Sequence, residues 1–276
     1  MKSAISARLI PYLVIAGLHF VGICGASQVA WFYALDEDRS AFEKLAGPPL
    51  RSVTQGTVTM HYYQIGPHRV CAARMGSGAT TTANTAATCL TLFPADRVIS
   101  TGPAGALDES LKTGSWCFVT RVVAWQKGTV ADGRILAGAG SSTACPVPLR
   151  DWPEGEWQTF PEVPAASGEA FIAATGVRNQ VASDTQCRIV EMNAAGLVSA
   201  LEGRAAKWLI LRVVSDHANE TAAGDFARFL KNYDGKGGVI AFAITKNLPP
   251  ELGQPDAHDA LRRLLDGIET KTETGN

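Results

Sequence analysis

The chain has 276 residues, of which 46% are hydrophobic and 18% charged, and its formal net charge is −1 at pH 7. This length and apolar content are enough for one sizeable hydrophobic core. No linker rich in Pro, Gly or Ser divides the chain, so we expect one domain over residues 27–276. The charges are mixed and form no basic stripe, which argues against a nucleic-acid-binding protein.

The N-terminal segment, residues 1–26, has the pattern of a targeting signal. Lys2 and Arg8 precede an apolar run over 9–23, and small residues follow. This order is typical of a secretory signal peptide, and we expect cleavage after Ala26. The alternative is an uncleaved membrane anchor, because the apolar segment is close to the ~20 residues that span a bilayer. Both interpretations place the folded domain outside the cytoplasm, periplasmic or secreted, either free or tethered to the membrane.

The first half of the folded part predicts strands that alternate with helices. Residues 29–35 form an apolar run typical of a buried strand, and a helical pattern follows the acidic residues 36–38 and ends near Leu45. An alternating pattern predicts a hairpin of strands over 57–66 and 69–74, the first at a sheet edge. The elements expected next are a helix over 79–92 and strands over 97–100 and 116–125.

The second half predicts a sheet that is covered on both faces. Residues 126–165 are rich in Gly, Pro and Trp and predict loops with short strands. The near-continuous apolar run from Lys207 to Val214 indicates a central parallel strand. The other expected elements are one that starts at 170–172, a strand over 188–191 and helices over 193–201, 222–233 and 256–268. This alternation predicts an α/β fold, a three-layer sandwich with a mixed, mostly parallel central sheet.

Several predicted strands end in turns that carry glycine or acidic residues. These turns lie at 34–38, 76–78, 102–105 and 215–219, and polar groups at 190–193 end a fifth strand. Ligands of open α/β sheets bind at the carboxyl ends of the strands, so we expect a small polar ligand and acid–base chemistry there. The six cysteines show no metal-ligand spacing. We therefore expect no metal or cofactor, and the sequence leaves open which cysteines, if any, form a disulfide.

The order of these turns resembles the nucleoside phosphorylase superfamily, and most closely the 5′-methylthioadenosine/S-adenosylhomocysteine nucleosidases. The matching segments, in chain order, are ALDED at 34–38, MGSGA at 75–79, TGPAGAL at 101–107, LKTGS at 111–115, SGEAFI at 167–172, VEMNA at 190–194 and RVVSDHAN at 212–219. The resemblance implies an enzyme that cleaves the N-glycosidic bond of a purine nucleoside. It also implies a homodimer.

The resemblance assigns two catalytic carboxylates. Asp216 matches the general acid that protonates N7 of the departing purine. Asp38 matches the carboxylate that activates the attacking water, with Glu37 as the alternative. Both aspartates also have a structural interpretation as helix caps.

The resemblance assigns further residues to the bound nucleoside. Phe171 matches the aromatic residue that stacks on the purine, and the backbone around it, which includes Ile172, faces the base edge. Met192 matches the residue under the ribose, and Ser215 orients Asp216. The remaining expected contacts are Glu191, on the ribose side or in a structural role, Asn193 at the ribose, and the backbone of Gly76, Ala104 and Gly105.

Some positions depart from the family pattern. Asn193 stands where the family has a glutamate that binds both ribose hydroxyls, and Pro103 replaces a serine of the glycine turn. Ser115 and Asn219 each replace an aspartate. These changes indicate a substrate other than methylthioadenosine, or a reduced activity. We expect Asn193→Glu to improve the affinity for nucleosides with an intact 2′,3′-diol.

The nucleophile and the catalytic competence stay open. Phosphorylases of this superfamily place an arginine just before the glycine turn, whereas this chain has Ile99, Ser100 and Thr101 there. The absence of this arginine favours water over phosphate as the nucleophile, because phosphate binding needs a cation at close range. Arg74 is the alternative phosphate ligand. A third interpretation is a non-catalytic protein of the same fold that binds or stores nucleosides.

Overall fold

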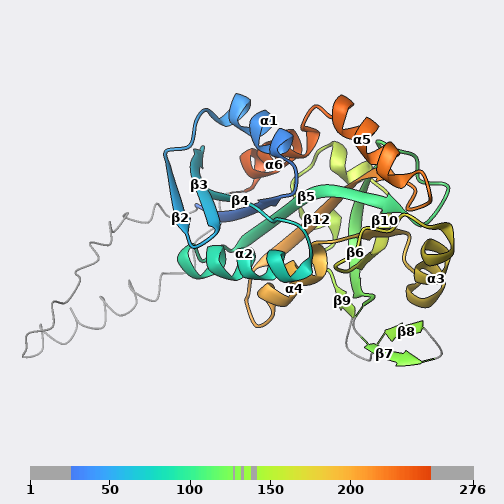
Figure 1. Ribbon diagram of the computed structural model, residues 1–276. Helices are drawn as coiled ribbons and strands as arrows, with labels where there is room; N and C mark the ends of the chain where they lie inside the picture. Colours follow the sequence, from blue (N-terminus) through green and yellow to red (C-terminus); the bar gives the residue numbers. More distant parts are fainter. Residues whose placement is uncertain (1–25, 127, 132–133, 138–141, 250–276) are drawn as a thin grey trace, which may run out of the picture.

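The computed structural model describes residues 26–126, 128–131, 134–137 and 142–249 (Figure 1). The elements are, in chain order, β1 (Gln28–Tyr33), α1 (Asp36–Ala46), β2 (Arg51–Gln55), β3 (Val58–Ile65), β4 (His68–Arg74), α2 (Ala79–Leu92), β5 (Arg97–Ala106), β6 (Trp116–Ala124), β7 (Gly128–Ala131), β8 (Arg134–Ala137), β9 (Ser142–Ala144), β10 (Glu162–Ser167), α3 (Thr175–Thr185), β11 (Ile189–Glu191), α4 (Ala194–Leu201), β12 (Lys207–Asp216), α5 (Ala222–Asn232) and α6 (Lys236–Asn247). The predicted N-terminal signal and the predicted helix over 256–268 lie outside the described residues. Within these residues, none of the helices has the length and apolar character needed to span a membrane.

A single ten-stranded mixed sheet forms the centre of the molecule. Its order is β11-β10-β6-β12-β5-β1-β4-β3-β2, and β9 pairs with β6. The neighbours β4, β1, β5 and β12 run parallel, so their carboxyl ends meet at one edge. β11 also pairs with the end of β5, where Val190 lies opposite Gly105. This pairing closes β5, β12, β6, β10 and β11 into a ring and brings the ends of β5, β11 and β12 together.

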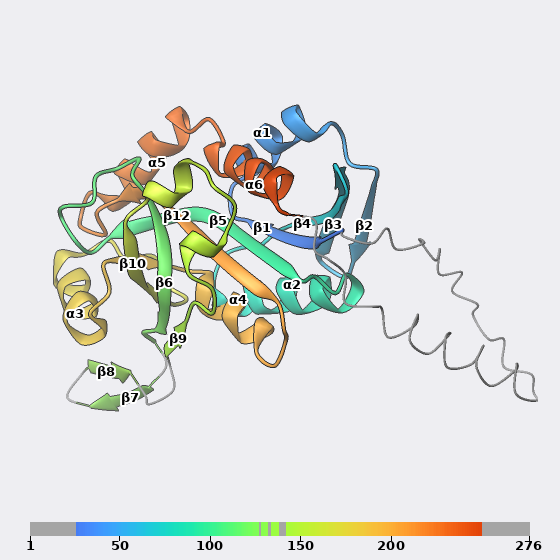
Figure 2. The same cartoon turned by 180° about the vertical axis from the view of Figure 1, so that it is seen from behind.

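Helices cover both faces of the sheet, which confirms the predicted three-layer sandwich. α2 and α4 pack together on one face, and α1, α5 and α6 lie on the other (Figures 1 and 2). Each interface has its own apolar core, with Phe32 and Leu197 on the α2–α4 side and Trp31 and Phe42 on the α1–α6 side. A smaller cluster lies next to α3 and contains Ile172.

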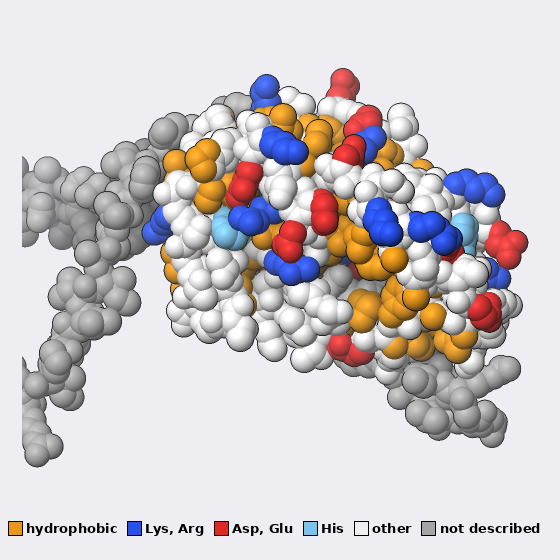
Figure 3. All heavy atoms as spheres, turned by 45° about the horizontal axis from the view of Figure 1, so that its top comes forward, with side chains coloured by type: hydrophobic (Ala, Val, Ile, Leu, Met, Phe, Trp, Pro, Cys, Tyr) orange, Lys and Arg blue, Asp and Glu red, His pale blue; other side chains and the backbone are white. Residues whose placement is uncertain are grey.

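The segment between β6 and β10 departs from the compact body. The β7–β8 hairpin projects from the body on the side of α3 (Figures 1 and 2). The chain then returns through two 3₁₀ turns, Leu149–Asp151 and Glu156–Thr159, and buries Trp152 and Trp157 in the α1–α6 core. Figure 3 shows that acidic and basic side chains are interspersed on the face that carries α1 and α5.

Some elements differ from the sequence predictions. The strand predicted over 97–100 continues through Pro103 to Ala106, because its glycines and proline sit inside the sheet instead of ending it. The predicted hairpin is present, but β2 covers its outer strand, so 57–66 is not the sheet edge. Residues 170–172 form a loop, and the preceding strand is β10. The five cysteines in the described part, Cys71, Cys89, Cys117, Cys145 and Cys187, are free thiols.

Candidate active site

A cavity of about 580 Å³ opens where the carboxyl ends of the central strands converge. The loops after β1, β4, β11 and β12 and the C-terminal part of β5 surround it, and the loop after β10 and helix α5 complete the wall. The structure brings ten of the eleven sequence-predicted site residues to this cavity: Gly76, Ala104, Gly105, Phe171, Ile172, Glu191, Met192, Asn193, Ser215 and Asp216. Asp38 is the one that it places elsewhere.

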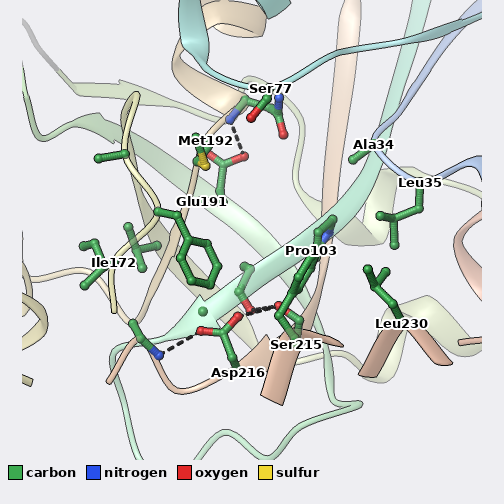
Figure 4. Close-up of a pocket in the computed structure, with 18 of the residues that line it drawn as sticks. Ala34, Leu35, Ser77, Pro103, Ile172, Glu191, Met192, Ser215, Asp216 and Leu230 are labelled. Atoms are coloured by element: carbon green, nitrogen blue, oxygen red, sulfur yellow. Dashed lines mark hydrogen bonds between the residues drawn. The ribbon is translucent and has the colours of Figure 1, made fainter. Parts of the chain in front are cut away.

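Asp216 ends β12 and is 1% exposed on the cavity wall. Its Oδ1 accepts a hydrogen bond from the Ala218 backbone N–H at 2.9 Å, and its Oδ2 lies 2.8 Å from the Ser215 hydroxyl (Figure 4). Burial raises the pKa of Asp216, and these two hydrogen bonds oppose the rise only partly. Asp216 therefore holds a proton at higher pH than an ordinary aspartate does.

Ser215 can serve both protonation states of Asp216. Its Oγ also lies 3.2 Å from the Ala104 carbonyl oxygen. When Asp216 is ionised, Ser215 donates to the carboxylate. When Asp216 is protonated, the acid donates to Ser215, which donates in turn to Ala104.

Gly105 makes room for the acid. It pairs with Asp216 on β12 and with Val190 on β11, so three strands meet at this residue. A Cβ atom at this position would lie 2.9 Å from Asp216 Oδ1 and 3.2 Å from the Ala218 Cβ. The positions of the Asp216 carboxylate and of Ala218 therefore favour glycine here.

Glu191 forms a buried ion pair with Arg212 behind the cavity wall. Glu191 Oε2 accepts from Arg212 Nε at 3.0 Å and Nη2 at 2.8 Å, and both side chains are at most 1% exposed. The same carboxylate accepts from the backbone N–H groups of Asn193 and Ala194, where it caps α4 (Figure 4). Four of these hydrogen bonds fall on Oε2, and Oε1 shares the Ala194 N–H, so Glu191 fixes the wall.

Asn193 joins the start of α4 to the glycine turn after β4. Its Nδ2 donates to the Gly76 carbonyl oxygen at 2.9 Å and to Thr82 Oγ1 at 2.8 Å. The side-chain amide hydrogens are therefore used inside the protein. What Asn193 can offer a ligand is its Oδ1, as a hydrogen-bond acceptor.

Aromatic and apolar side chains form the opposite wall. Phe171 is 46% exposed, and its ring centroid lies 6.0 Å from that of Phe226 on α5. Leu35 and Leu230 extend this wall (Figure 4). A flat apolar ring between such groups and Asp216 would be bound through its faces.

The structure does not bring Asp38 to the cavity. Asp38 is fully buried beneath α6, where its Oδ1 accepts from the Tyr233 hydroxyl at 2.5 Å and its Oδ2 from Thr101 Oγ1 at 3.3 Å. Burial raises the pKa of Asp38 to about 6, against the lowering effect of hydrogen bonds from Tyr233, Thr101 and the N–H groups of Gly237 and Gly238. Its carboxylate caps α6. Glu37, the alternative, is exposed and does not line the cavity either.

Arg74 is the one Lys or Arg that lines the cavity in the described part of the chain. Its Nε donates to the Ala34 carbonyl oxygen at 3.4 Å, and its Nη1 lies 3.3 Å from Asp36 Oδ2. Both members of this ion pair are more than half exposed, so the pair is weak. An incoming anion could therefore compete with Asp36 for Arg74.

Sequence reasoning missed three residues of the site. Phe226 and Leu230 reach the cavity from α5, four residues apart on one face of that helix. Arg212 holds Glu191 from inside the core. Its signal was in the sequence: it is the one charged residue within the apolar run of β12, and a buried arginine needs an acidic partner.

Comparison with known proteins identifies the family. The model of the phosphorylase superfamily matches residues 20–237. The chain belongs to the phosphorylase superfamily. A comparison with curated protein sequences gave no match.

Solved structures of two kinds of enzyme show the same fold. Futalosine hydrolase of Helicobacter pylori superposes with a TM-score of 0.73 at 18% identity, covering 80% of this chain and 98% of that one. The 5′-methylthioadenosine/S-adenosylhomocysteine nucleosidase of Neisseria meningitidis, in complex with methylthio-immucillin-A, gives 0.69 at 22% identity, covering 80% and 100%. The H. pylori nucleosidase mutant with 5′-methylthioadenosine in its active site gives 0.70 at 18%, covering 80% and 99%.

Proposed function

We propose that this protein hydrolyses the N-glycosidic bond of a purine nucleoside, with Asp216 as the general acid. The observation that carries the proposal is the environment of Asp216, a buried carboxylic acid of raised pKa on the wall of a cavity whose other side is aromatic. An acid whose pKa is raised by burial suits a reaction whose leaving group is a poor anion, because it supplies the proton that lets the base leave as a neutral molecule.

In the proposed reaction, the purine lies against Phe171 with N7 toward Asp216. The bond between the ribose C1′ and the base nitrogen breaks, and its electron pair goes to the base. Asp216 gives its proton to N7, so the base leaves as a neutral molecule. Water adds to C1′, and the proton that it releases restores Asp216.

The attack by water needs no second carboxylate in this proposal. Asp38 is held away from the cavity by Tyr233 and Thr101, and Glu191 is held in the wall by Arg212 and backbone N–H groups. We propose that protonation of the base by Asp216 gives C1′ enough cationic character for neutral water to attack. This differs from the two-carboxylate reaction that the family resemblance implies.

A phosphate-dependent reaction is the second candidate, and Arg74 supports it. Its guanidinium lies at the cavity, and its exposed partner Asp36 could be displaced by phosphate. The choice is tested by incubating the purified protein with a panel of purine nucleosides, with and without inorganic phosphate. We expect free base in both samples. Release that requires phosphate would establish the phosphorylase. Nucleoside binding without turnover would indicate a non-catalytic binding protein, and neither turnover nor binding would refute the enzyme proposal.

The role of Asp216 is tested by Asp216→Asn. We expect a loss of about 10²- to 10⁴-fold in kcat, the range typical of a general acid, with unchanged circular dichroism. Since only the protonated acid is competent, wild-type kcat should fall as pH rises through the raised pKa of Asp216. An unchanged rate in the variant, or a rate that rises with pH over this range, would refute the assignment.

A further inference from the structure

Residues 168–174, which we call the purine loop, carry Phe171 and Ile172 and begin with Gly168, whose N–H donates to the Glu191 carbonyl oxygen at 3.1 Å. Within the described part of the chain, no hydrogen bond involves the backbone of residues 170–173. Ile172 is buried, whereas Phe171 is half-exposed. The position of the loop therefore depends on how its two ends are fixed.

Glu169 fixes the first end to helix α2. Its Oε1 accepts from the Thr80 backbone N–H at 2.8 Å and from Thr80 Oγ1 at 2.7 Å. The N-terminus of α2 has no side-chain cap of its own, because Gly78 precedes it. Glu169 thus supplies the cap from another part of the chain, where the helix dipole favours a negative charge. The Glu169 N–H also bonds to the Gln126 side chain.

Gly78 leaves the space that this carboxylate occupies. A Cβ atom at Gly78 would lie 2.2 Å from Glu169 Oε2, and the residue has a φ of +90°. The glycine turn after β4 is therefore shaped to admit Glu169.

Glu220 fixes the second end in the same way. Its Oε1 accepts from the Thr175 backbone N–H at 2.9 Å, and its Oε2 accepts from Thr175 Oγ1 at 2.6 Å. These bonds lower the pKa of Glu220 to about 2. The N-terminus of α3 also has no side-chain cap of its own. Glu220 lies four residues after Asp216, so this bond ties the purine loop to the loop that follows the acid at the end of β12.

We propose that Glu169 and Glu220 are positioning residues, which hold Phe171 over the purine end of the cavity by capping α2 and α3 from the two ends of the purine loop. This inference rests on the proposed function. Neither glutamate lines the cavity, so both act through the loop. Without them, the loop would keep Ile172 as its main buried anchor, and Phe171 would spend less time in the position that stacks on a base.

The first test needs no ligand and uses the full chain with Glu169→Ala, Glu169→Gln and Glu220→Ala. Chymotrypsin cleaves after aromatic residues of exposed mobile segments, and Phe171 is such a residue once the loop is released. We expect cleavage after Phe171 to become about fivefold faster in both alanine variants. Glu169→Gln keeps an acceptor for Thr80 and should stay near wild type. Glu202→Ala, at an exposed residue after α4, is the matched control.

The second test measures binding of free adenine by calorimetry. We expect Glu169→Ala to raise the Kd about five- to tenfold, in keeping with the loss of hydrogen bonds to a charged acceptor. Because Glu169 acts through Phe171, adding Glu169→Ala to Phe171→Ala should cause no further loss. With adenosine as substrate, KM should rise while kcat stays within about twofold, since Asp216 is untouched.

Three outcomes would overturn the inference. The first is an unchanged rate of cleavage after Phe171 in the alanine variants. The second is an additive loss of adenine affinity in the double variant, and the third is a wild-type protein that binds no adenine. If adenine binds but no purine nucleoside is cleaved, the proposed function fails, while chymotrypsin cleavage and adenine binding still test the positioning role of Glu169 and Glu220. Gly78→Ala keeps the glutamate in the sequence, but the added Cβ atom occupies the space of its carboxylate. This variant should reproduce the faster cleavage after Phe171.

Discussion

At the scale of single residues, the two aspartates expected to share the reaction lie in different surroundings. Asp216 faces the cavity with one backbone donor and one serine hydroxyl. Asp38 faces α6 and is held by Tyr233 and Thr101. Burial raises the pKa of both, but only Asp216 lies where a ligand could take its proton. A raised pKa therefore marks a catalytic acid only together with access to the ligand.

The hydrogen-bond partners of Asn193 change the role that we expect for it. From the sequence, Asn193→Glu is expected to improve ribose binding. In the structure, the Asn193 amide donates hydrogen bonds to Gly76 and Thr82, whereas a glutamate carboxylate can only accept. Thr82 cannot donate to that carboxylate without giving up the bond from its hydroxyl to Gly78. We now predict that Asn193→Glu lowers the free energy of unfolding by ~1–3 kcal/mol and gains no nucleoside affinity.

Urea unfolding and calorimetric titration with adenosine check this prediction. Asn179→Glu, at an exposed position on α3, is the control for adding a carboxylate and should leave both quantities unchanged. Tighter adenosine binding by a fully stable Asn193→Glu protein would show that the amide is not needed in its structural role.

At the scale of elements, the close packing of α4 on α2 supports the cavity. Asn193 at the start of α4 binds Gly76 and Thr82, so a shift between these helices would move the ribose side of the site. Gly196 sets their separation: a Cβ atom there would lie 1.9 Å from the Ala79 carbonyl oxygen and 2.9 Å from the Ala83 nitrogen. Both are backbone atoms, so the helices would have to separate.

We therefore predict that Gly196→Ala destabilises the protein by ~1–3 kcal/mol, the usual cost of overpacking, and weakens nucleoside binding. Gly176→Ala is the matched control, because Gly176 lies in α3 with nothing within 4 Å of the added Cβ. It should be neutral or slightly stabilising, since alanine favours a helix. Thermal unfolding of the two variants tests this prediction, and equal Tm values for Gly196→Ala and Gly176→Ala would contradict the packing argument.

The elements also show where the sequence was informative. The helix predicted over 79–92 coincides with α2, and β12 extends the predicted strand by two residues to Asp216. Strand β10 was missed because Pro164 interrupts it at an irregularity in its pairing. Helix α3 buries only Val181 and Thr185, so its sequence carries no apolar stripe for a pattern to detect. Helix α6 was not predicted, because Gly237 and Gly238 in its first turn have low helix propensity.

At the scale of the whole molecule, motif order predicted the cavity but not the orientation of every side chain in it. Ten predicted residues line it because they lie at or just after the carboxyl ends of strands, and the sheet brings those ends together. Asp38 also follows the end of a strand, but the segment that packs on it, around Tyr233 and α6, lies about 200 residues later in the sequence. A Cβ atom at Gly238 would lie 1.8 Å from the Asp38 carbonyl oxygen. A contact between residues so far apart in the sequence cannot be predicted from the residues around Asp38.

Asp38 also links the stability of the whole molecule to pH. It joins α1 to β5 through Thr101 and to the α5–α6 connection through Tyr233, so its free energy belongs to the global fold. Its pKa is raised from 3.8 to about 6 in the folded state. The folded protein therefore binds this proton more tightly than the unfolded chain does. The stabilisation from this proton is complete below about pH 4 and is lost as pH rises through about 6.

We predict that the difference in free energy of unfolding between wild type and Asp38→Asn shrinks by roughly 2 kcal/mol from pH 4 to pH 7, most of the value given by a pKa raised to about 6 at about 1.4 kcal/mol per pKa unit. Asparagine can keep the bond from Tyr233 and has no proton to lose, so its own stability lacks this component. Denaturant unfolding at one-unit pH steps measures the difference and removes the effect of other titrating groups. Asp36→Asn, exposed at the start of the same helix, should show no such trend. A wild-type advantage that is constant with pH, or that grows toward pH 7, would mean that Asp38 is not a buried carboxylate holding α6.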